Sequence, residues 1–333
     1  MESLENQAGS DDGAASSAAR RGTAILLATC NGATFLAEQL YSLQAQGDQD
    51  WVLVVRDDLS TDATGTILDD FAAALGPGRL LRLPSGPRRL GALGNFLALL
   101  QGAPAARRFA FCDQDDVWLP DKLARAARLM EHEAQERPVL YCARQWIVND
   151  TLRERSLSPS VARPPSLRNA LVQNIATGCT IVINQAARRA ILAAPAPAGT
   201  LHDWWSYLVM TAVGGRVLID PEPVMLYRQH ATNVVGAAPG VARRALSAVR
   251  RGPERFTGLF MAHVDALRRH PDLTPDARRL LLELLALPEA GRVARLAMLW
   301  RSGLYRQGIL EQAGLYAWVA LWRLSGESLA RRG

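Results

Sequence analysis

The sequence Phe109-Ala-Phe-Cys-Asp-Gln-Asp-Asp-Val-Trp118 places a cluster of carboxylates directly after an apolar run. Such a run is typical of a buried strand, so the cluster lies where a strand meets a loop. Alternate side chains of an extended backbone share one face, so Asp113 and Asp115 can present oxygen atoms to the same point. Carboxylate oxygens are the ligands that Mg²⁺ and Mn²⁺ prefer, and open α/β sheets bind ligands at strand ends. The pattern predicts a divalent-cation site.

A second interpretation of these carboxylates is structural. Asp115, Asp116 and Asp121 would cap the helix that Pro120 opens, because acidic side chains accept hydrogen bonds from the free N–H groups of a first turn. Both interpretations require a strand end followed by a helix. They differ in whether a metal binds.

Outward from the cluster, apolar runs alternate with segments of helical spacing. This alternation favours a parallel α/β sheet that continues as a mixed sheet. Strands are predicted at 23–29, 51–56, 79–83, 109–112, 139–142, 178–184, 216–219 and 224–227, with one buried strand inside 169–187. Helices are predicted at 33–46, 63–75, 91–101, 120–136 and 202–212.

The sequence beyond about residue 233 consists mainly of Ala, Leu and Arg in helical periodicity. Breaks are expected near Gly252-Pro253, Pro271 and Pro288. We therefore predict a main domain over 23–235 and a helical C-terminal region over 236–333. Residues 296–324 alternate apolar side chains, three of them tryptophan, with arginine. Such a segment either lies at a membrane interface or packs as a helix pair on the main domain, and both interpretations stand.

Composition narrows the class of protein. Of the 333 residues 49% are hydrophobic and 21% charged, as in an ordinary globular protein, and the net charge is +6. This charge suits an anionic substrate or an acidic membrane surface. Nucleic acid is not expected as a partner, because the arginines concentrate in the C-terminal region and no aromatic-rich sheet accompanies them.

The ends and the cysteines of the chain indicate its compartment. Residues 1–22 are rich in Ala, Ser, Gly and Asp and lack the apolar centre of a signal peptide, so a disordered leader is expected. The four cysteines are widely spaced and form no Cys-x-x-Cys pair, which favours reduced core thiols. These features predict a cytoplasmic protein without a transmembrane helix, either free or peripheral at the inner face of a membrane.

Five polar motifs follow one another in a specific order: Asp57-Asp-Leu-Ser-Thr-Asp62, Asp113-Gln-Asp-Asp-Val-Trp-Leu-Pro-Asp-Lys122, Thr177-Gly-Cys179, His202-Asp-Trp-Trp205 and Tyr227-Arg-Gln-His230. In this order they resemble a bacterial family 2 glycosyltransferase of the GT-A fold, and more closely its rhamnosyltransferase-like branch. The match covers residues 23–235. The resemblance implies a GT-A type, Rossmann-like mixed sheet flanked by helices, followed here by a helical C-terminal appendage.

The resemblance also implies roles for single residues. Asp203 corresponds to the catalytic base of an inverting transfer, and Asp115 and His230 to ligands of Mg²⁺ or Mn²⁺. Asp58 would accept a hydrogen bond from the N3–H of uracil or thymine, which cytosine lacks. The residues expected to bind the nucleotide sugar are Thr29, Asn31, Asp58, Gly91, Asn95, Asp113 and Trp204.

Structural roles compete with some of these assignments. Asp57 and Asp58 would also serve as helix caps, and Asp203 suits the first turn of a helix. Trp204 and Trp205 would also serve as core residues. A single histidine such as His230 is weak support for a metal site without the motif around it.

Three positions depart from the family pattern. Cys30 stands where the family usually has an aromatic residue that stacks on the base. Leu59 replaces the glycine of Asp-Asp-Gly-Ser, and Arg89 replaces the first asparagine of the Asn-x-Gly-x-x-x-Asn-Phe element that Gly91 and Asn95 continue. Arg89 would instead contact a phosphate.

The favoured function is metal-dependent, inverting sugar transfer from a nucleoside diphosphate donor. Resemblance implies L-rhamnose from dTDP, with UDP-linked sugars also open, and an acceptor that is a surface polysaccharide such as O-antigen or a lipid-linked oligosaccharide. The alternative is a catalytically silent module that binds nucleotide or glycan at the membrane, but such a module needs no base at Asp203. A phosphohydrolase or nucleotidyltransferase built on Asp113 and Asp115 lacks a nucleophile signature or a Gly-rich phosphate loop, respectively.

Overall fold

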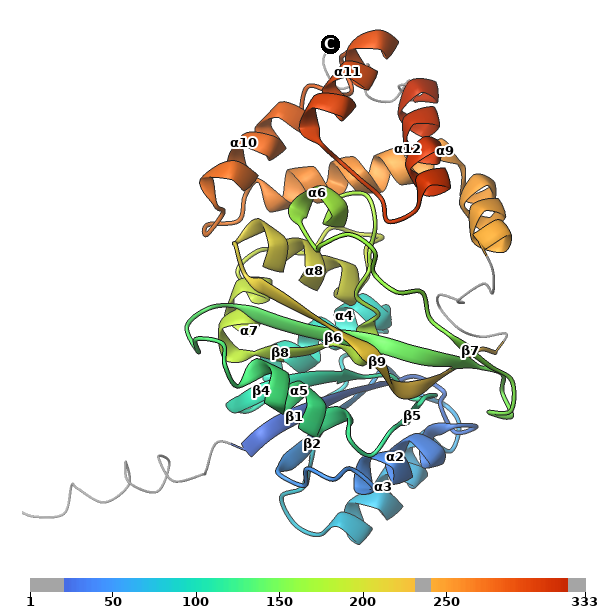
Figure 1. Ribbon diagram of the computed structural model, residues 1–333. Coiled ribbons are helices and arrows are strands. Elements are labelled where there is room, and N and C mark those ends of the chain that lie inside the picture. Colours follow the sequence, from blue (N-terminus) through green and yellow to red (C-terminus); the bar gives the residue numbers. More distant parts are fainter. Residues whose placement is uncertain (1–20, 231–240, 323–333) are drawn as a thin grey trace, which may run out of the picture.

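The computed structural model describes residues 21–230 and 241–322, which form a mixed sheet between helices (Figure 1). The strands are β1 (Arg21–Thr29), β2 (Trp51–Asp57), β3 (Leu80–Arg82), β4 (Ala106–Cys112), β5 (Val117–Trp118), β6 (Val139–Val148), β7 (Arg155–Leu157), β8 (Val182–Asn184) and β9 (Arg216–Arg228). The helices are α2 (Leu36–Gln44), α3 (Thr64–Leu75), α4 (Gly91–Gly102), α5 (Lys122–Met130), α6 (Leu167–Ala170), the 3-10 helix η1 (Gly178–Thr180), α7 (Gln185–Leu192), α8 (His202–Ala212), α9 (Val241–Leu267), α10 (Pro275–Leu284), α11 (Arg292–Ser302) and α12 (Ile309–Leu321).

The described strands lie in the order β3-β2-β1-β4-β8-β6-β9-β5, and β7 pairs with β6. The first four run parallel, whereas β8 is antiparallel to both β4 and β6. Residues 24–27 of β1 and 51–55 of β2 are buried, as expected for parallel strands that are covered on both faces. The predicted α/β fold with a mixed sheet is confirmed.

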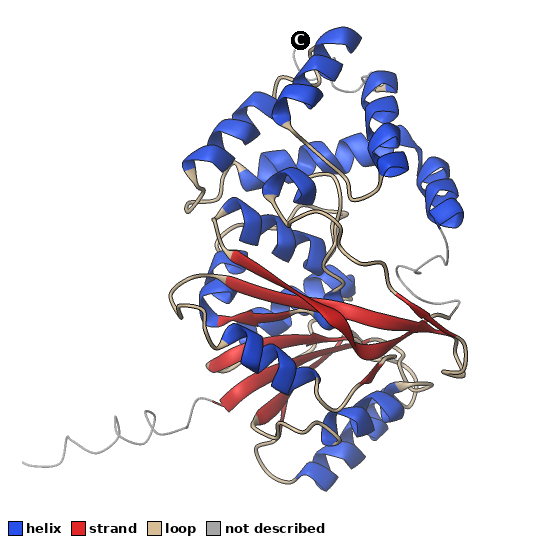
Figure 2. Cartoon of the chain, in the orientation of Figure 1, coloured by secondary structure: helices blue, strands red, loops and turns tan. Residues whose placement is uncertain are grey.

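Helices cover both faces of the sheet (Figure 2). One apolar core lies between the sheet and α2, α3 and α5, and it includes Leu40 and Leu123. The other lies beneath α4, α7 and α8 and includes Phe96 and Leu208. The sheet is therefore held between two layers of helices, with an apolar core on each face.

The C-terminal helices α9 to α12 extend the second core. Phe260, Leu281, Leu299 and Leu315 belong to the same buried cluster as Trp205 of α8. The helical C-terminal region is thus packed onto the sheet domain through a continuous apolar core. No helix of the described chain is long and apolar enough to cross a lipid bilayer.

Several boundaries differ from those predicted. Most of the leader over 1–22, and the domain boundary at 235, lie outside the described residues, but Arg21 and Gly22 already belong to β1. The helix expected over 120–136 spans only α5. The break expected at Gly252-Pro253 is wrong, because α9 continues to Leu267 and its second half is packed into the core through Phe260. Tertiary packing here outweighs the cost of a proline within a helix.

The middle of the chain differs most. The buried strand expected inside 169–187, at 178–184, is confirmed as β8 but is shorter, because Gly178–Thr180 form η1 and α7 begins at Gln185. The two strands expected at 216–219 and 224–227 form the single strand β9. Its pairing with β6 passes from Ala143–Asp220 to Arg144–Pro223, so residues 221–222 form a β-bulge. Pro221 has no backbone N–H to donate, and at a bulge it needs no hydrogen bond to the neighbouring strand.

Candidate active site

Three parallel strands end at the same edge of the sheet and bring three motifs together. Thr29 of β1 is paired with Asp57 of β2, and Leu27 of β1 with Cys112 of β4. The loops that follow these strands are therefore neighbours. The Asn31 Oδ1 accepts a hydrogen bond of 2.8 Å from the backbone N–H of Thr61, which joins the first two loops.

Gln114 joins the first loop to the carboxylate loop, a role that the sequence analysis missed. Its Oε1 accepts a 2.8 Å hydrogen bond from the Cys30 backbone N–H, and its Nε2 donates to the Cys30 carbonyl at 3.1 Å. A Cβ at Gly32 would lie 2.2 Å from the Gln114 Oε1, so glycine leaves the space that this amide needs. The signal in the sequence was an amide, able both to donate and to accept, between two carboxylates.

Asp58 is only 2% exposed, and both of its carboxylate oxygens already accept hydrogen bonds. The donors are the Arg56 guanidinium and the backbone N–H groups of Leu90 and Gly91, at 2.8–3.1 Å. Burial acts to raise the pKa of Asp58, but these donors outweigh it and the pKa is lowered. Asn95, also buried, accepts a 2.9 Å bond from Arg56. The structure thus brings Asp58, Gly91 and Asn95 together, and contact with a base requires an amide of residues 90–91 to move.

The turn after Asp58 has a left-handed backbone at Leu59, the position where the family motif has glycine. Leu59 has a φ of 62° and is 36% exposed. The Asp57 carboxylate accepts bonds from the Ser60 N–H and hydroxyl and from the Thr29 hydroxyl, so Asp57 and Thr29 hold the turn. The Arg89 Nη2 donates to the Leu59 carbonyl at 3.0 Å. Arg89 therefore contacts this turn.

The two predicted metal ligands lie in contact. The His230 Nε2 is 2.7 Å from the Asp115 Oδ2, and their side chains are 14% and 19% exposed. The buried Arg228 fixes this arrangement, because it donates to the Asp115 carbonyl at 2.9 Å and pairs with Glu38 of α2. Its guanidinium also lies over the Phe35 ring, at 4.3 Å from the centroid.

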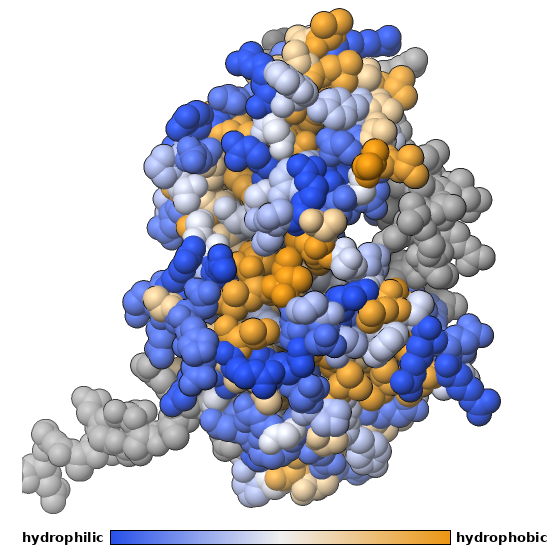
Figure 3. All heavy atoms as spheres, viewed as in Figure 1, coloured by the Kyte–Doolittle hydropathy of each residue, from blue (hydrophilic) through white to orange (hydrophobic). Residues whose placement is uncertain are grey.

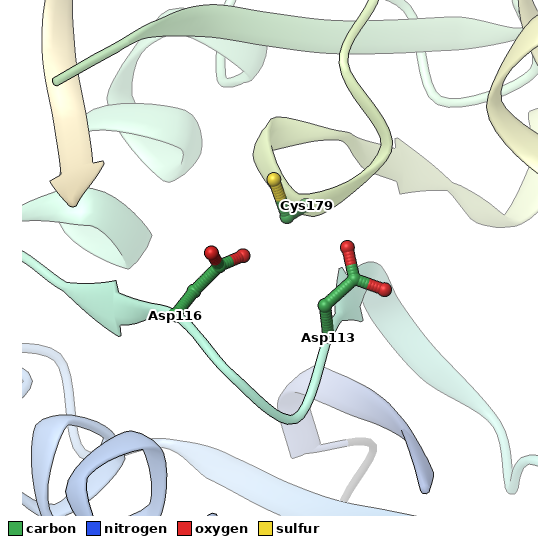
Figure 4. Close-up of side chains that lie close together, drawn as sticks. All are labelled: Asp113, Asp116 and Cys179. Atoms are coloured by element: carbon green, nitrogen blue, oxygen red, sulfur yellow. The ribbon is translucent and has the colours of Figure 1, made fainter. Parts of the chain in front are cut away.

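A second group of candidate ligands lies beside this pair. Asp113 and Asp116 rise from the loop between β4 and β5 toward Cys179 of η1 (Figure 4). One ligand atom from each lies within 4.8 Å of the others. Burial raises the pKa of Asp116 and of the Cys179 thiol well above their usual values, and it raises that of Asp113 to about 7, with Asp115 and Asp203 as further causes. A protonated thiol is a poor metal ligand, so Asp113 is the member of this group best suited to a cation.

Asp203 lies in the first turn of α8 and is 9% exposed. Its Oδ2 accepts a 3.2 Å bond from the Gly178 N–H, and its Oδ1 a 2.6 Å bond from the Trp204 N–H. Burial raises the pKa of Asp203 to about 6, against the effect of these hydrogen bonds. A Cβ at Gly178 would lie 2.7 Å from the His202 Nε2, so glycine is required for this close approach. Asp203 contacts Gly178 of η1, and Asp113 lies beside Cys179 of the same short helix, so η1 brings the two carboxylates to one part of the molecule.

Trp204 points to another part of the molecule. Its indole N–H donates to the Ala170 carbonyl at 2.7 Å, and its ring lies edge-on to His263 of α9 at 4.9 Å. Trp205 is fully buried. These contacts are with α6 and α9 and agree with the core-packing interpretation of both tryptophans.

The only lysine of the chain lies beneath the carboxylates, which the sequence analysis did not foresee. Lys122 is fully buried, donates to the Cys179 carbonyl at 2.5 Å and lies over the Trp118 ring at 3.2 Å from the centroid. Burial lowers its pKa to about 8, while the charges of Cys179, Cys112, Asp116 and Asp113 act in the opposite direction. The lysine ties η1, and hence the amide of Gly178, to the start of α5.

The sequence is similar to a known protein family and to individual members of it. The family model described as glycosyl transferase family 2 matches residues 24–194. The dTDP-rhamnosyl transferase RfbG of Shigella flexneri is 30% identical over 219 residues, which cover 63% of this chain and 74% of that protein. The uncharacterized protein Mb1547 of Mycobacterium bovis is 28% identical over 213 residues, covering 63% of this chain and 59% of its own length.

A solved structure with a similar fold is that of Staphylococcus aureus TarS residues 1–349 in complex with UDP-GlcNAc. It superimposes with a TM-score of 0.57 and 16% sequence identity, covering 79% of this chain and 70% of that one. At this identity the likeness establishes the fold alone.

The left-handed backbone at Leu59 generates a stability prediction. A leucine in this conformation costs about 1–2 kcal/mol that glycine does not incur, although glycine costs more entropy on folding. We expect Leu59→Gly to raise the free energy of unfolding by about 1 kcal/mol in chemical denaturation. Leu81 in β3 is similarly exposed, at 37%, and is not among the residues with positive φ. Leu81→Gly should therefore destabilise the protein, and equal effects of the two substitutions would contradict strain at Leu59.

Proposed function

Because the chain belongs to glycosyl transferase family 2, we propose that it transfers a sugar from a nucleoside diphosphate to a hydroxyl group, with inversion and with the help of a divalent cation. The observation that carries this proposal is that Asp203 and Asp113 both lie beside η1, Asp203 through the Gly178 N–H and Asp113 through an oxygen within 4.8 Å of the Cys179 sulfur. Burial raises the pKa of Asp203 to about 6, so its carboxylate is a competent base near neutral pH. A silent binding module would not need such a base.

We propose L-rhamnose from dTDP-rhamnose as the transferred sugar, with UDP-linked sugars as the other candidates. The support is the relative from Shigella flexneri, whose name describes a dTDP-rhamnosyl transferase. The proposed acceptor is a surface polysaccharide or a lipid-linked oligosaccharide, since the +6 net charge suits an anionic substrate or membrane.

The proposed nucleotide site lies over the loops after β1 and β2. Asn31 is exposed there, whereas Thr29 and Asn95 are buried and support the loops. Asp58 would accept the N3–H of thymine or uracil once the backbone amide of Leu90 or Gly91 gives up its bond. Trp204 would act indirectly, by holding α8.

The donor set fits a divalent cation. Asp115 and His230 offer a carboxylate oxygen and an imidazole nitrogen that converge within 2.7 Å, and both side chains are partly exposed. Oxygen and nitrogen ligands suit Mn²⁺, and Mg²⁺ if water completes the shell. When bound, the cation would offset the negative charge that develops on the leaving diphosphate.

The proposed mechanism gives each carboxylate a separate task. Asp203 accepts the proton of the acceptor hydroxyl while that oxygen bonds to the anomeric carbon, and the bond from this carbon to the diphosphate oxygen breaks on the opposite face. The N–H groups of Gly178 and Trp204 hold the Asp203 carboxylate during this step. Asp113, whose pKa burial raises to about 7, would contact the donor sugar.

We also propose that α11 and α12 contact a membrane surface. Each helix buries one face, through Leu299 and Leu315, and exposes apolar side chains on another. Apolar atoms gather at this end of the molecule (Figure 3). The exposed large residues are Val293, Trp300, Ile309, Leu310 and Leu321, at 60–90%. Exposed Arg292 and Arg301 flank them and would meet acidic headgroups.

Asp203→Asn tests the proposed base. We expect turnover to fall at least ~100-fold, with donor and metal binding nearly unchanged, because only proton removal is lost. Wild-type turnover should fall below pH about 6, since protonation of Asp203 removes the base, and a bound cation would move this limb lower. Asp220→Asn is the control, because Asp220 is also a buried carboxylate, 1% exposed, but is paired with Arg125. Full turnover in Asp203→Asn would remove Asp203 from this role.

The membrane proposal is tested with Trp300→Glu and Leu310→Glu combined. We expect binding to phosphatidylcholine vesicles containing phosphatidylglycerol to weaken by about tenfold or more, because exposed apolar area and charge balance are both lost. Leu282→Glu on α10, where the leucine is 58% exposed, is the control and should not change vesicle binding. Equal cosedimentation of all three proteins, or none by the wild type, would count against a membrane contact.

A further inference from the structure

One residue of the C-terminal helices contacts the segment that carries Asp203. His263 of α9 is fully buried, and its Nε2 lies 2.8 Å from the Thr200 hydroxyl oxygen. The edge of its ring packs against Trp204, with centroids 4.9 Å apart and planes at 60°. His263 thus touches the chain three residues before Asp203 and one residue after it.

The start of α8 depends on such contacts from elsewhere. Leu201, the residue before the first turn of α8, makes no side-chain hydrogen bond to that turn. Asp203 and Trp204 lie in the first turn, where the Asp203 carboxylate itself accepts a hydrogen bond from the Trp204 N–H. The backbone that leads into the helix is held by tertiary contacts as well, and the hydrogen bond between His263 and Thr200 supplies one.

The C-terminal region also braces the other side of Asp203. The Gln173 amide donates to Glu311 of α12 at 2.9 Å and accepts a 2.7 Å bond from the Gln307 N–H. The side chain of the next residue, Asn174, lies close enough to Asp203 to act to lower the pKa of its carboxyl group. Two segments near Asp203, the start of α8 and residues 173–174, are therefore tied to helices far along the chain.

We propose that His263 is a positioning residue for Asp203, so that the C-terminal helices form part of the catalytic machinery. This inference rests on the proposed function. A general base must be held within a fraction of an ångström of its working position, and supporting hydrogen bonds supply that precision. Burial lowers the pKa of His263 to about 4, so the neutral imidazole acts here as a hydrogen-bonding group and not as a charge.

The chain offers a matched control in His270, seven residues after His263. It is 1% exposed, and its Nε2 lies 2.9 Å from the Ala190 carbonyl of α7, away from Asp203. Replacing His263 by leucine removes one side-chain hydrogen bond, whereas replacing His270 removes two, because the His270 Nδ1 also accepts from the Asp272 N–H at 3.1 Å. Only the loss at His263 should affect turnover.

The experiment compares steady-state kinetics and thermal stability of His263→Leu, His263→Gln, Thr200→Val and His270→Leu in the full-length protein. We expect His263→Leu and Thr200→Val each to lower kcat about tenfold with the donor KM little changed. The double variant His263→Leu/Thr200→Val should lose no more kcat than either single variant, because both substitutions remove the same hydrogen bond. His263→Gln should restore most of the rate, since its amide nitrogen can reach Thr200. His270→Leu should lose at least as much stability and keep its kcat.

Equal kcat values in His263→Leu and His270→Leu, or additive losses in the double variant, would overturn the positioning role. If His263→Leu does not fold, Thr200→Val tests the same bond, because valine keeps the shape of threonine. An unchanged kcat in Thr200→Val would then overturn the inference. Failure of the proposed function is distinct, since it would appear as a wild-type protein that transfers no sugar from any nucleotide donor.

Discussion

Burial of negative charge is the constraint on which the rest of this structure depends. A carboxylate away from water must be paired, hydrogen-bonded or protonated, because an uncompensated buried charge costs several kcal/mol. Each buried carboxylate of the site is stabilised in a different way. Asp58 accepts hydrogen bonds from the Arg56 guanidinium and from two backbone N–H groups, and its pKa is lowered. Asp203 accepts hydrogen bonds from two backbone N–H groups, but burial still raises its pKa. Asp116 is the least compensated, because it is fully buried, its Oδ2 has no hydrogen-bond partner among the described residues, and burial raises its pKa well above the usual value.

The same constraint explains why distant segments are fixed to one another. The groups that satisfy the site come from far along the chain, as in the bonds of Gln114 to the first loop and of Lys122 to the Cys179 carbonyl. His263 extends this network to the C-terminal helices. The proposed reaction needs such a rigid frame, because bond formation and bond cleavage occur at opposite faces of one carbon atom.

Local patterns predicted much of the fold and the position of the site. Apolar runs identified β1, β2 and β4, and the helix over 202–212 was predicted with its observed limits. The carboxylate cluster was correctly placed at the end of a strand, since Asp113 follows β4 directly. The roles of single residues were harder to foresee. Gln114, Lys122 and His263 act through partners 84, 57 and 63 residues away, and α9 continues through Pro253 because its second half is packed in the core.

Calorimetric titration of the protein with dTDP, UDP, GDP and CDP, with and without Mn²⁺, tests the account most directly. We predict that dTDP or UDP binds, that Mn²⁺ strengthens this binding, and that Asp115→Asn removes the effect of the metal. CDP and GDP should bind much more weakly, because neither offers the pyrimidine N3–H that Asp58 would accept. Folded protein that binds none of the four nucleotides would contradict the proposed transfer and favour a silent interaction module.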